Sequence, residues 1–274
     1  QTFVALDGGA GAWCGLTAAG AVLCWGQWSG STLSDHPTQI EGGAPLVAIT
    51  VGRDHACGLT GDGTAQCWGI NSSGQLGDGS HTSTASQVTV SGNHTFASIT
   101  AGEAHTCALG TDSQVYCWGR NEQGELGDGE QNSRTVPAPV AGDLSFAVLS
   151  SGAAAATTCA ITDAGTAYCW GANDLGQLGD GTLVDRSAPT PIPDHTFTQI
   201  DAGFANTCAI GADVWCWGAA ADGQPGDYIY FTTRGPVLAA RSWGSSAGRS
   251  TAPRTWSPQP PTSRTPGSGH RRSR

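Results

Sequence analysis

Residues 101–129 read AGEAHTCALG TDSQVYCWGR NEQGELGDG, and the central phrase of this stretch returns five times along the chain. Each copy holds a cysteine, a short polar turn, and a second cysteine followed by Trp-Gly. The five copies run from Cys14 to Gly26, Cys57 to Gly69, Cys107 to Gly119, Cys159 to Gly171 and Cys208 to Gly218. Their first cysteines lie 43, 50, 52 and 49 residues apart. Such a period indicates a repeat architecture, in which each unit buries its apolar face against its neighbours.

A longer pattern surrounds each copy. Every unit opens with two apolar residues three positions apart, such as Phe96 and Ile99, and continues with a small residue and glycine. Three units close with a loop of the form Gly-(Gln/Glu)-Leu-Gly-Asp-Gly, at residues 74–79, 124–129 and 176–181; the fifth has an altered version at 223–227, and the first lacks it. Short apolar runs between Gly, Asp, Asn and Ser turns predict strands joined by hairpins. About four strands per unit are typical of the blades of a β-propeller.

These motifs, in this order and spacing, closely resemble the RCC1-type (regulator of chromosome condensation) repeat. More narrowly, they resemble the cysteine-paired version common in secreted bacterial proteins. The best matches are residues 49–79 and 99–129, and the resemblance covers about residues 1–240. It implies an all-β propeller of four-stranded blades, with repeats at about 1–42, 43–92, 93–142, 143–194 and 195–240. Because propellers of this family usually have seven blades, five repeats predict an incomplete ring.

The ten cysteines are paired locally, four times as Cys-x9-Cys and once as Cys-x7-Cys. This spacing places two cysteines opposite each other on adjacent strands, where facing Cα atoms lie about 4.5–5.5 Å apart. The resemblance implies one disulfide inside each blade: Cys14–Cys24, Cys57–Cys67, Cys107–Cys117, Cys159–Cys169 and Cys208–Cys216. Reduced core thiols and metal binding are the alternatives, although Cys-x2–4-Cys zinc knuckles are absent. Disulfides predict an oxidising location, secreted or periplasmic.

Charge is unevenly distributed. All 22 acidic residues lie at or before Asp227 beside only four arginines, so residues 1–228 carry a formal charge of −18. The other eight arginines lie in residues 229–274, which contain no acid. An acidic body argues against binding to nucleic acid phosphates. No apolar run approaches the roughly 20 residues of a membrane-spanning helix, so membrane insertion is not predicted.

The tryptophans of the five Cys-Trp-Gly motifs form the largest aromatic set. A ring of tryptophans for stacking a sugar or sensing light is one interpretation. Because all five share one register of a structural motif, we interpret them instead as the core of the repeat: Trp25, Trp68, Trp118, Trp170 and Trp217. Three further tryptophans, Trp13, Trp28 and Trp215, lie outside this register and are expected to be exposed.

No residues stand out as a catalytic, metal or cofactor site. The Gly-Asp-Gly loops each offer one carboxylate where calcium needs about six oxygen ligands, so we interpret the aspartates as turn formers. His55 and His105 share a repeat position and are expected to hydrogen-bond structurally. No Ser/His/Asp set or carboxylate pair supports nucleophilic or acid–base catalysis. The sequence therefore predicts a protein that is not an enzyme.

Residues 241–274 lose every repeat feature and are rich in Arg, Ser, Pro and Thr. One interpretation is a disordered basic tail. The other is a sixth repeat translated out of frame, because the chain contains no Lys or Met, which suggests a GC-rich gene. A shifted frame through this segment would yield a string resembling the opening of a repeat.

The sequence as a whole predicts a secreted, non-enzymatic binding or scaffold propeller with a protein or surface-glycan partner, and self-association through open blade faces. An inhibitor of a secreted enzyme and a guanine nucleotide exchange factor are the alternatives. Variable loops at the ends of a propeller present its binding surface. The candidate binding residues in these loops are Trp28, His81, Glu130, Arg134, Asp185 and Arg186.

Overall fold

The computed structural model describes residues 2–28, 31–219 and 233–238, and these residues form strands and turns without a helix. The first ten strands are β1 (Phe3–Gly8), β2 (Ala12–Thr17), β3 (Val22–Trp28), β4 (Ser31–Gln39), β5 (Leu46–Val51), β6 (His55–Thr60), β7 (Ala65–Gly69), β8 (Thr84–Thr89), β9 (Phe96–Ala101) and β10 (His105–Gly110). The next ten are β11 (Val115–Gly119), β12 (Arg134–Pro139), β13 (Phe146–Ser150), β14 (Thr157–Thr162), β15 (Ala167–Gly171), β16 (Arg186–Pro191), β17 (Gln199–Ala202), β18 (Asn206–Ile210), β19 (Val214–Gly218) and β20 (Thr233–Leu238).

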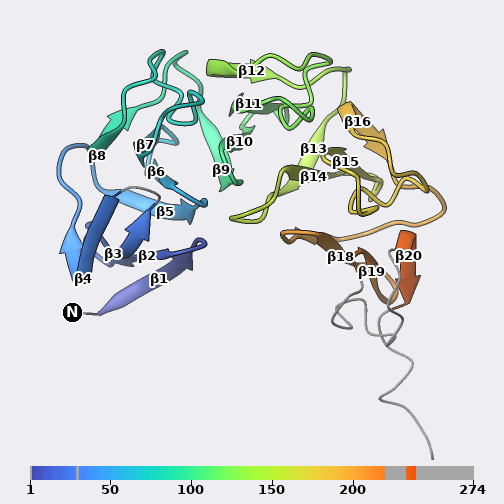
Figure 1. Cartoon of the computed structure of the whole chain (residues 1–274), viewed down its shortest axis with the longest axis horizontal. Helices are drawn as coiled ribbons and strands as arrows, with labels where there is room; N and C mark the ends of the chain where they lie inside the picture. The colour runs from blue at the N-terminus through green and yellow to red at the C-terminus, as the bar shows by residue number, and fades with distance from the viewer. Residues whose placement is uncertain (1, 29–30, 220–232, 239–274) are drawn as a thin grey trace, which may run out of the picture. The chain divides into compact units, whose positions relative to one another are not determined.

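The strands form five four-stranded antiparallel sheets, each built from four consecutive strands in chain order. The sheets are the blades of a propeller, numbered 1 to 5 here, and Figure 1 shows them following one another along the chain. The first strands of successive blades contact each other, β1 with β5, β5 with β9, β9 with β13 and β13 with β17. This confirms the prediction of four-stranded blades in an incomplete ring.

Each blade contains one disulfide between its second and third strands. The two cysteines face each other in register, as Cys107 faces Cys117 across β10 and β11. Their Cα atoms lie 4.0–4.1 Å apart in all five bonds, Cys14–Cys24, Cys57–Cys67, Cys107–Cys117, Cys159–Cys169 and Cys208–Cys216. No cysteine of the chain is free. The repeat's cysteine spacing therefore corresponds to a hairpin cross-link.

The apolar core lies between the blades. Each of its four clusters joins the disulfide of one blade to the tryptophan of the next; one, for example, contains Cys57 and Cys67 together with Trp118. The others pair the cysteines of blades 1, 3 and 4 with Trp68, Trp170 and Trp217. Because each blade supplies half of a core, its apolar face is buried only when a neighbour is present.

The glycine that ends each Cys-Trp-Gly motif has a backbone reason. Gly119 has a φ of +103°, a conformation that residues with a side chain rarely adopt. A Cβ atom at Gly119 would also lie 2.6 Å from the carbonyl oxygen of Ala104. The chain can therefore turn from the third strand into the following loop only with glycine at this position.

Two expectations concern other parts of the chain. The altered loop at residues 223–227 and the segment 241–274 lie outside the described residues. Among the described residues, none forms a helix that could cross a membrane.

Candidate functional site

The Gly-(Gln/Glu)-Leu-Gly-Asp-Gly loops, at residues 74–79, 124–129 and 176–181, are held by an asparagine two residues after the Cys-Trp-Gly motif. In blade 2, Asn71 Oδ1 accepts the N–H of Leu76 at 2.9 Å, and Asn71 Nδ2 donates to Asp78 Oδ1 at 3.2 Å. Asp78 Oδ1 also accepts the N–H of Ser80 at 2.9 Å. Blades 3 and 4 repeat these bonds through Asn121 and Asn173. The loop aspartates are therefore committed to the turn that they form.

In blade 2, the predicted binding residue His81 makes an internal contact, since its Nδ1 lies 3.2 Å from the main-chain oxygen of Ser72. Three further predicted binding residues make internal contacts in blades 3 and 4. Arg134 Nε donates to Asp128, and Arg186 Nε donates to Asp180 at 2.7 Å. Asp185 Oδ1 accepts the N–H of Asn173 at 2.7 Å. These side chains brace the loops of blades 3 and 4 in this structure.

The loop of one blade receives hydrogen bonds from the next blade. Trp118 Nε1 donates to the main-chain carbonyl of Gln75 at 2.9 Å, and Thr106 Oγ1 donates to the same carbonyl at 2.9 Å. The same two bonds recur on Glu125 from Trp170 and Thr158, and on Gln177 from Trp217 and Thr207. The repeat tryptophan is thus an inter-blade donor in blades 3 to 5, and its side chain is fully buried in blades 2 to 5.

A histidine completes this contact in two junctions. His55 Nε2 lies 2.8 Å from Thr106 Oγ1, and His105 Nε2 lies 2.8 Å from Thr158 Oγ1. Because each threonine hydroxyl donates to a loop carbonyl, the histidine must donate to the hydroxyl, so its proton is on Nε2. This confirms the expected structural role of the two histidines.

Burial decides the charge state of these histidines. Both are fully buried, and the cost of desolvating an imidazolium lowers the pKa of each from 6.5 to about 3. A positive charge on His105 lowers the pKa of His55 further, whereas Asp54 raises it. In the same way, Arg120 lowers the pKa of His105 and Glu103 raises it. Both histidines are neutral at pH 7.

Four charged residues connect blades 2 and 3. Glu103 binds Arg53 and Arg120, each at 2.5 Å, and Arg120 Nε donates to Glu125 Oε1 at 2.8 Å. Burial raises the pKa of Glu103, but the hydrogen bonds and charges of the two arginines outweigh it and lower the pKa overall. Blades 2 and 4 have glutamine at the position of Glu125 and an uncharged residue at the position of Arg120. The glutamate and the arginine therefore occur together in blade 3, and blades 2 and 4 have neither.

The first junction differs from the others because blade 1 has no such loop. The expectation that Trp28 is exposed is wrong: its side chain is only 3% exposed. It lies in the cluster that contains Trp68, where Leu76, Leu126 and Leu178 lie in the clusters of the later junctions. Trp28 therefore fills the space of the missing leucine.

No described residue covers the face of blade 1 that points away from blade 2. Phe3 and Trp25 are only partly buried, whereas the residues that match them in blades 2 to 5 are buried. Leu6 is 57% exposed and Trp13 is 51% exposed. The exposure of Trp13 agrees with its place outside the repeat register, and Trp215 is partly buried.

Other exposed side chains gather on loops. His81 and Glu130 are exposed, as expected for binding-loop residues. Phe204 was not among the predicted residues, and it is 73% exposed between β17 and β18. Val184 lies in the same variable loop as the predicted residues Asp185 and Arg186 and is 58% exposed. For Phe204, the available signal was a lone aromatic residue among small and polar ones.

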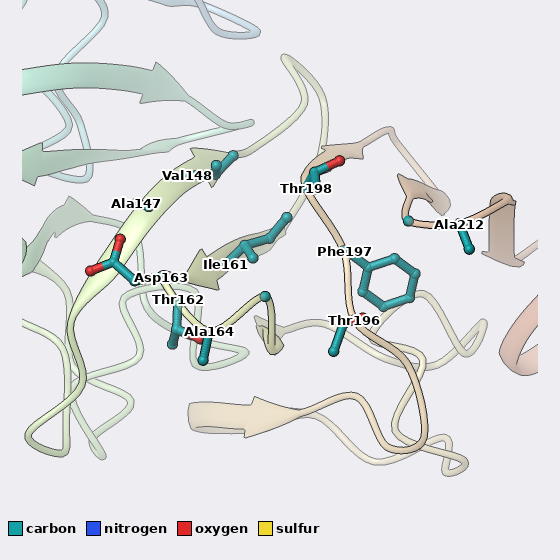
Figure 2. A pocket seen from close by; sticks show the side chains of 12 residues that line it. Ala147, Val148, Ile161, Thr162, Asp163, Ala164, Thr196, Phe197, Thr198 and Ala212 are labelled. Atoms are coloured by element: carbon teal, nitrogen blue, oxygen red, sulfur yellow. The ribbon is translucent and has the colours of Figure 1, made fainter.

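A hollow of about 510 Å³ lies between blades 4 and 5. Figure 2 shows Val148 and Ile161 of blade 4 on one side of it and Phe197 on the other. The blade 5 hairpin at Gly211 and Ala212 also lines the hollow. This hairpin is two residues shorter than the others, since its cysteines are 8 rather than 10 positions apart. Among the described residues, no group of three His, Cys, Asp or Glu side chains could hold a metal ion.

Models of the regulator of chromosome condensation (RCC1) repeat match residues 62–109, 112–161 and 164–210, and a second model of the same repeat matches 46–75 and 96–125. These matches cover more than half of the chain. The chain therefore belongs to the RCC1 repeat family.

Particular relatives agree with this. The chain is 34% identical over 74 residues to the ultraviolet-B receptor UVR8 of Arabidopsis thaliana, a match covering 25% of this chain and 17% of the receptor. Yeast RCC1 (Prp20), in its structure with Kap60, superposes with a TM-score of 0.76 at 19% identity, covering 88% of this chain and 62% of that chain. The ectodomain of the Physcomitrella patens receptor kinase CR4 gives a TM-score of 0.54 at 24% identity, covering 79% and 50%. The chain thus spans less than two thirds of each.

Proposed function

We propose that the chain is a non-enzymatic binding or scaffold propeller that works in an oxidising location and holds a protein partner through loops at one end of its blades. The observation that carries this proposal is the exposure of apolar side chains at that end. Phe204 is 73% exposed, Val184 58% and Leu183 38%. Exposed apolar groups on loops are typical of interaction surfaces.

These residues share one end of the molecule for a topological reason. In an antiparallel blade, the loops after the first and third strands leave at the same end. Phe204 follows the first strand of blade 5, and Val184 follows the third strand of blade 4. The first strands of these blades are bonded, since the N–H of Ala202 donates to Ser150 Oγ at 3.1 Å.

The use of polar groups supports a binding role over a catalytic one. The loop aspartates accept bonds from the asparagines and arginines of their own blades, and the buried histidines are bonded to threonines of the next blade. None of these groups combines an open position with a perturbed pKa, as acid–base catalysis requires.

The disulfides support an oxidising location. Each cross-link closes a short hairpin and contributes about 2–3 kcal/mol on the chain-entropy model. Five of them make a large part of the stability depend on oxidation, which secreted and periplasmic proteins experience.

The test is capture of a partner from the extracellular fraction of the source organism, with the chain immobilised. The double variant Phe204→Ser, Val184→Ser should lose the captured protein. Ile210→Ser is the matched control, because Ile210 is 42% exposed on the same blade but ends β18 at the opposite end. Equal capture by the double variant and the control would contradict the proposal.

Two alternatives receive less support. The hypothesis of an enzyme inhibitor depended on Trp28 as an exposed aromatic side chain in a binding loop. Trp28 is buried. The Prp20 structure is described with its binding properties to Gsp1p and histones. At 19% identity the likeness concerns the fold alone, so we propose neither partner for this chain.

A further inference from the structure

The junction between blades 1 and 2 has buried donors without acceptors beside an open hollow. We propose that this junction is a docking site for a turn of a partner protein, which offers a main-chain carbonyl to these donors. The inference rests on the proposed protein-binding function and names a site and a partner chemistry for it.

The three later junctions show what fills such a site. In each, a glycine-containing turn places one main-chain carbonyl where the tryptophan of the next blade donates to it, at 2.9–3.0 Å. A leucine of the same turn, fully buried, enters the adjacent core cluster. Carbonyl and leucine together form the contact.

The first junction has only half of this contact. Trp28 supplies the apolar group, but no described residue of the first unit supplies the carbonyl. Trp68 Nε1 and Trp28 Nε1 are both buried and have no hydrogen-bond partner. A buried donor without a partner destabilises the fold, and an acceptor that reaches either one removes this penalty by forming the bond.

A hollow of about 350 Å³ opens beside Trp28, and its other lining residues are Ala10, Gly11, Gln27, Arg53 and Asp54. Its volume lies at the lower end of the roughly 300–1,000 Å³ of ligand sites. Trp28 thus belongs both to the buried cluster and to the wall of the hollow.

The charges around the hollow favour a neutral acceptor. The guanidinium of Arg53 binds Glu103 at 2.5 Å and lies 3.7 Å from Asp54. Because this cation is already paired with two carboxylates, an anionic ligand would gain little from it. A main-chain carbonyl needs no counter-charge, and it is the acceptor that the other junctions use.

The experiment titrates the 15N-labelled chain with the capped tetrapeptide acetyl-Gly-Gln-Leu-Gly-amide, the sequence of residues 74–77, and follows the indole N–H resonances. The Trp28 and Trp68 resonances should shift downfield and saturate. Those of Trp118, Trp170 and Trp217 should not move, because their acceptors are in place. Trp28→Phe removes one donor and should weaken binding about tenfold, as the loss of one hydrogen bond does. The exposed Trp13→Phe serves as the matched control and should leave affinity unchanged.

The proposal is overturned if the Trp28 and Trp68 resonances stay fixed up to the solubility limit of the peptide, or if Trp118 moves with them. The unsubstituted chain decides this even where Trp28→Phe fails to fold. Loss of capture by Phe204→Ser, Val184→Ser without peptide binding would remove this site and leave the proposed function standing. If the peptide binds but Phe204→Ser, Val184→Ser leaves capture unaffected, the proposed function is removed and this site is left standing.

Discussion

Blades 1 and 3 have the same strand order and the same disulfide, yet the surroundings of their repeat tryptophans differ. Trp118 of blade 3 is fully buried and donates to the carbonyl of Gln75 in the blade before it. Trp25 of blade 1 is partly exposed, and no described residue precedes its blade to cover it. The sheet and its cross-link are therefore properties of one repeat, whereas the core belongs to pairs of repeats.

The comparison predicts its largest effect for the tryptophans. Trp118→Ala should lower the free energy of unfolding by about 3–5 kcal/mol, because it removes a fully buried ring and its hydrogen bond. Trp25→Ala should cost roughly 1–2 kcal/mol, since part of that ring already contacts water. Chemical denaturation of both variants measures the difference, and equal losses would contradict a core shared between blades.

Removing the disulfide of blade 1 or of blade 3 sharpens the comparison, because the two losses of stability are expected to be equal. Replacing Cys107 and Cys117 by alanine should cost about 2–3 kcal/mol, and so should replacing Cys14 and Cys24. Both bonds join residues 10 positions apart, so they close loops of equal length. Thermal melting with intact and substituted pairs tests this. A clearly smaller loss in blade 1 would show that the cross-link also depends on its neighbour.

Acid should weaken the junctions that contain histidine. The pKa of His105 is lowered from 6.5 to about 3 in the folded protein, so only the unfolded chain binds a proton between these values. The stabilisation is complete above pH 6.5 and is lost as pH falls towards 3, by on the order of 1 kcal/mol per pH unit. His105→Asn, which copies Asn206 of blade 5, should flatten this slope in unfolding measured from pH 7 to pH 4. An unchanged slope would mean that His105 is protonated in the fold.

A smaller effect is expected for the threonine that links two blades. Thr158→Val should cost about 1–2 kcal/mol, because it leaves His105 and the carbonyl of Glu125 each without one hydrogen bond. The matched change Ala56→Thr in blade 2 should stabilise little, since the preceding blade has no loop carbonyl for it. Denaturation midpoints check both. A gain from Ala56→Thr equal to the loss at Thr158 would contradict the role of the loop.

The strand order, the hairpin register and the inter-blade position of Trp68, Trp118, Trp170 and Trp217 could be predicted from sequence, because each follows from a repeated spacing. Trp28 could not. It occupies the space of a leucine that other blades supply from a loop, and no spacing shows one residue type taking the place of another. The partial exposure of Trp25 likewise depends on a neighbouring blade rather than on its own repeat.

The candidate site was predicted only in outline. His81 and Glu130 are exposed on loops, but Arg134, Asp185 and Arg186 bind groups of their own blades. Sequence variability between repeats marks both kinds of residue equally. Only the positions of their partners, such as Asp128 and Asp180, show which of these side chains brace their own loops.

Peptide-resolved hydrogen exchange tests the central claim most directly, namely that the loop carbonyl holds successive blades together. We predict that amides of the β2–β3 hairpin exchange faster than those of β10–β11, because no described residue of blade 1 offers a carbonyl to Trp68 and the outer face of blade 1 is partly exposed. Both hairpins carry the same cross-link, so the disulfide cannot produce the difference. Equal protection of the two hairpins, or slower exchange in blade 1, would contradict the account.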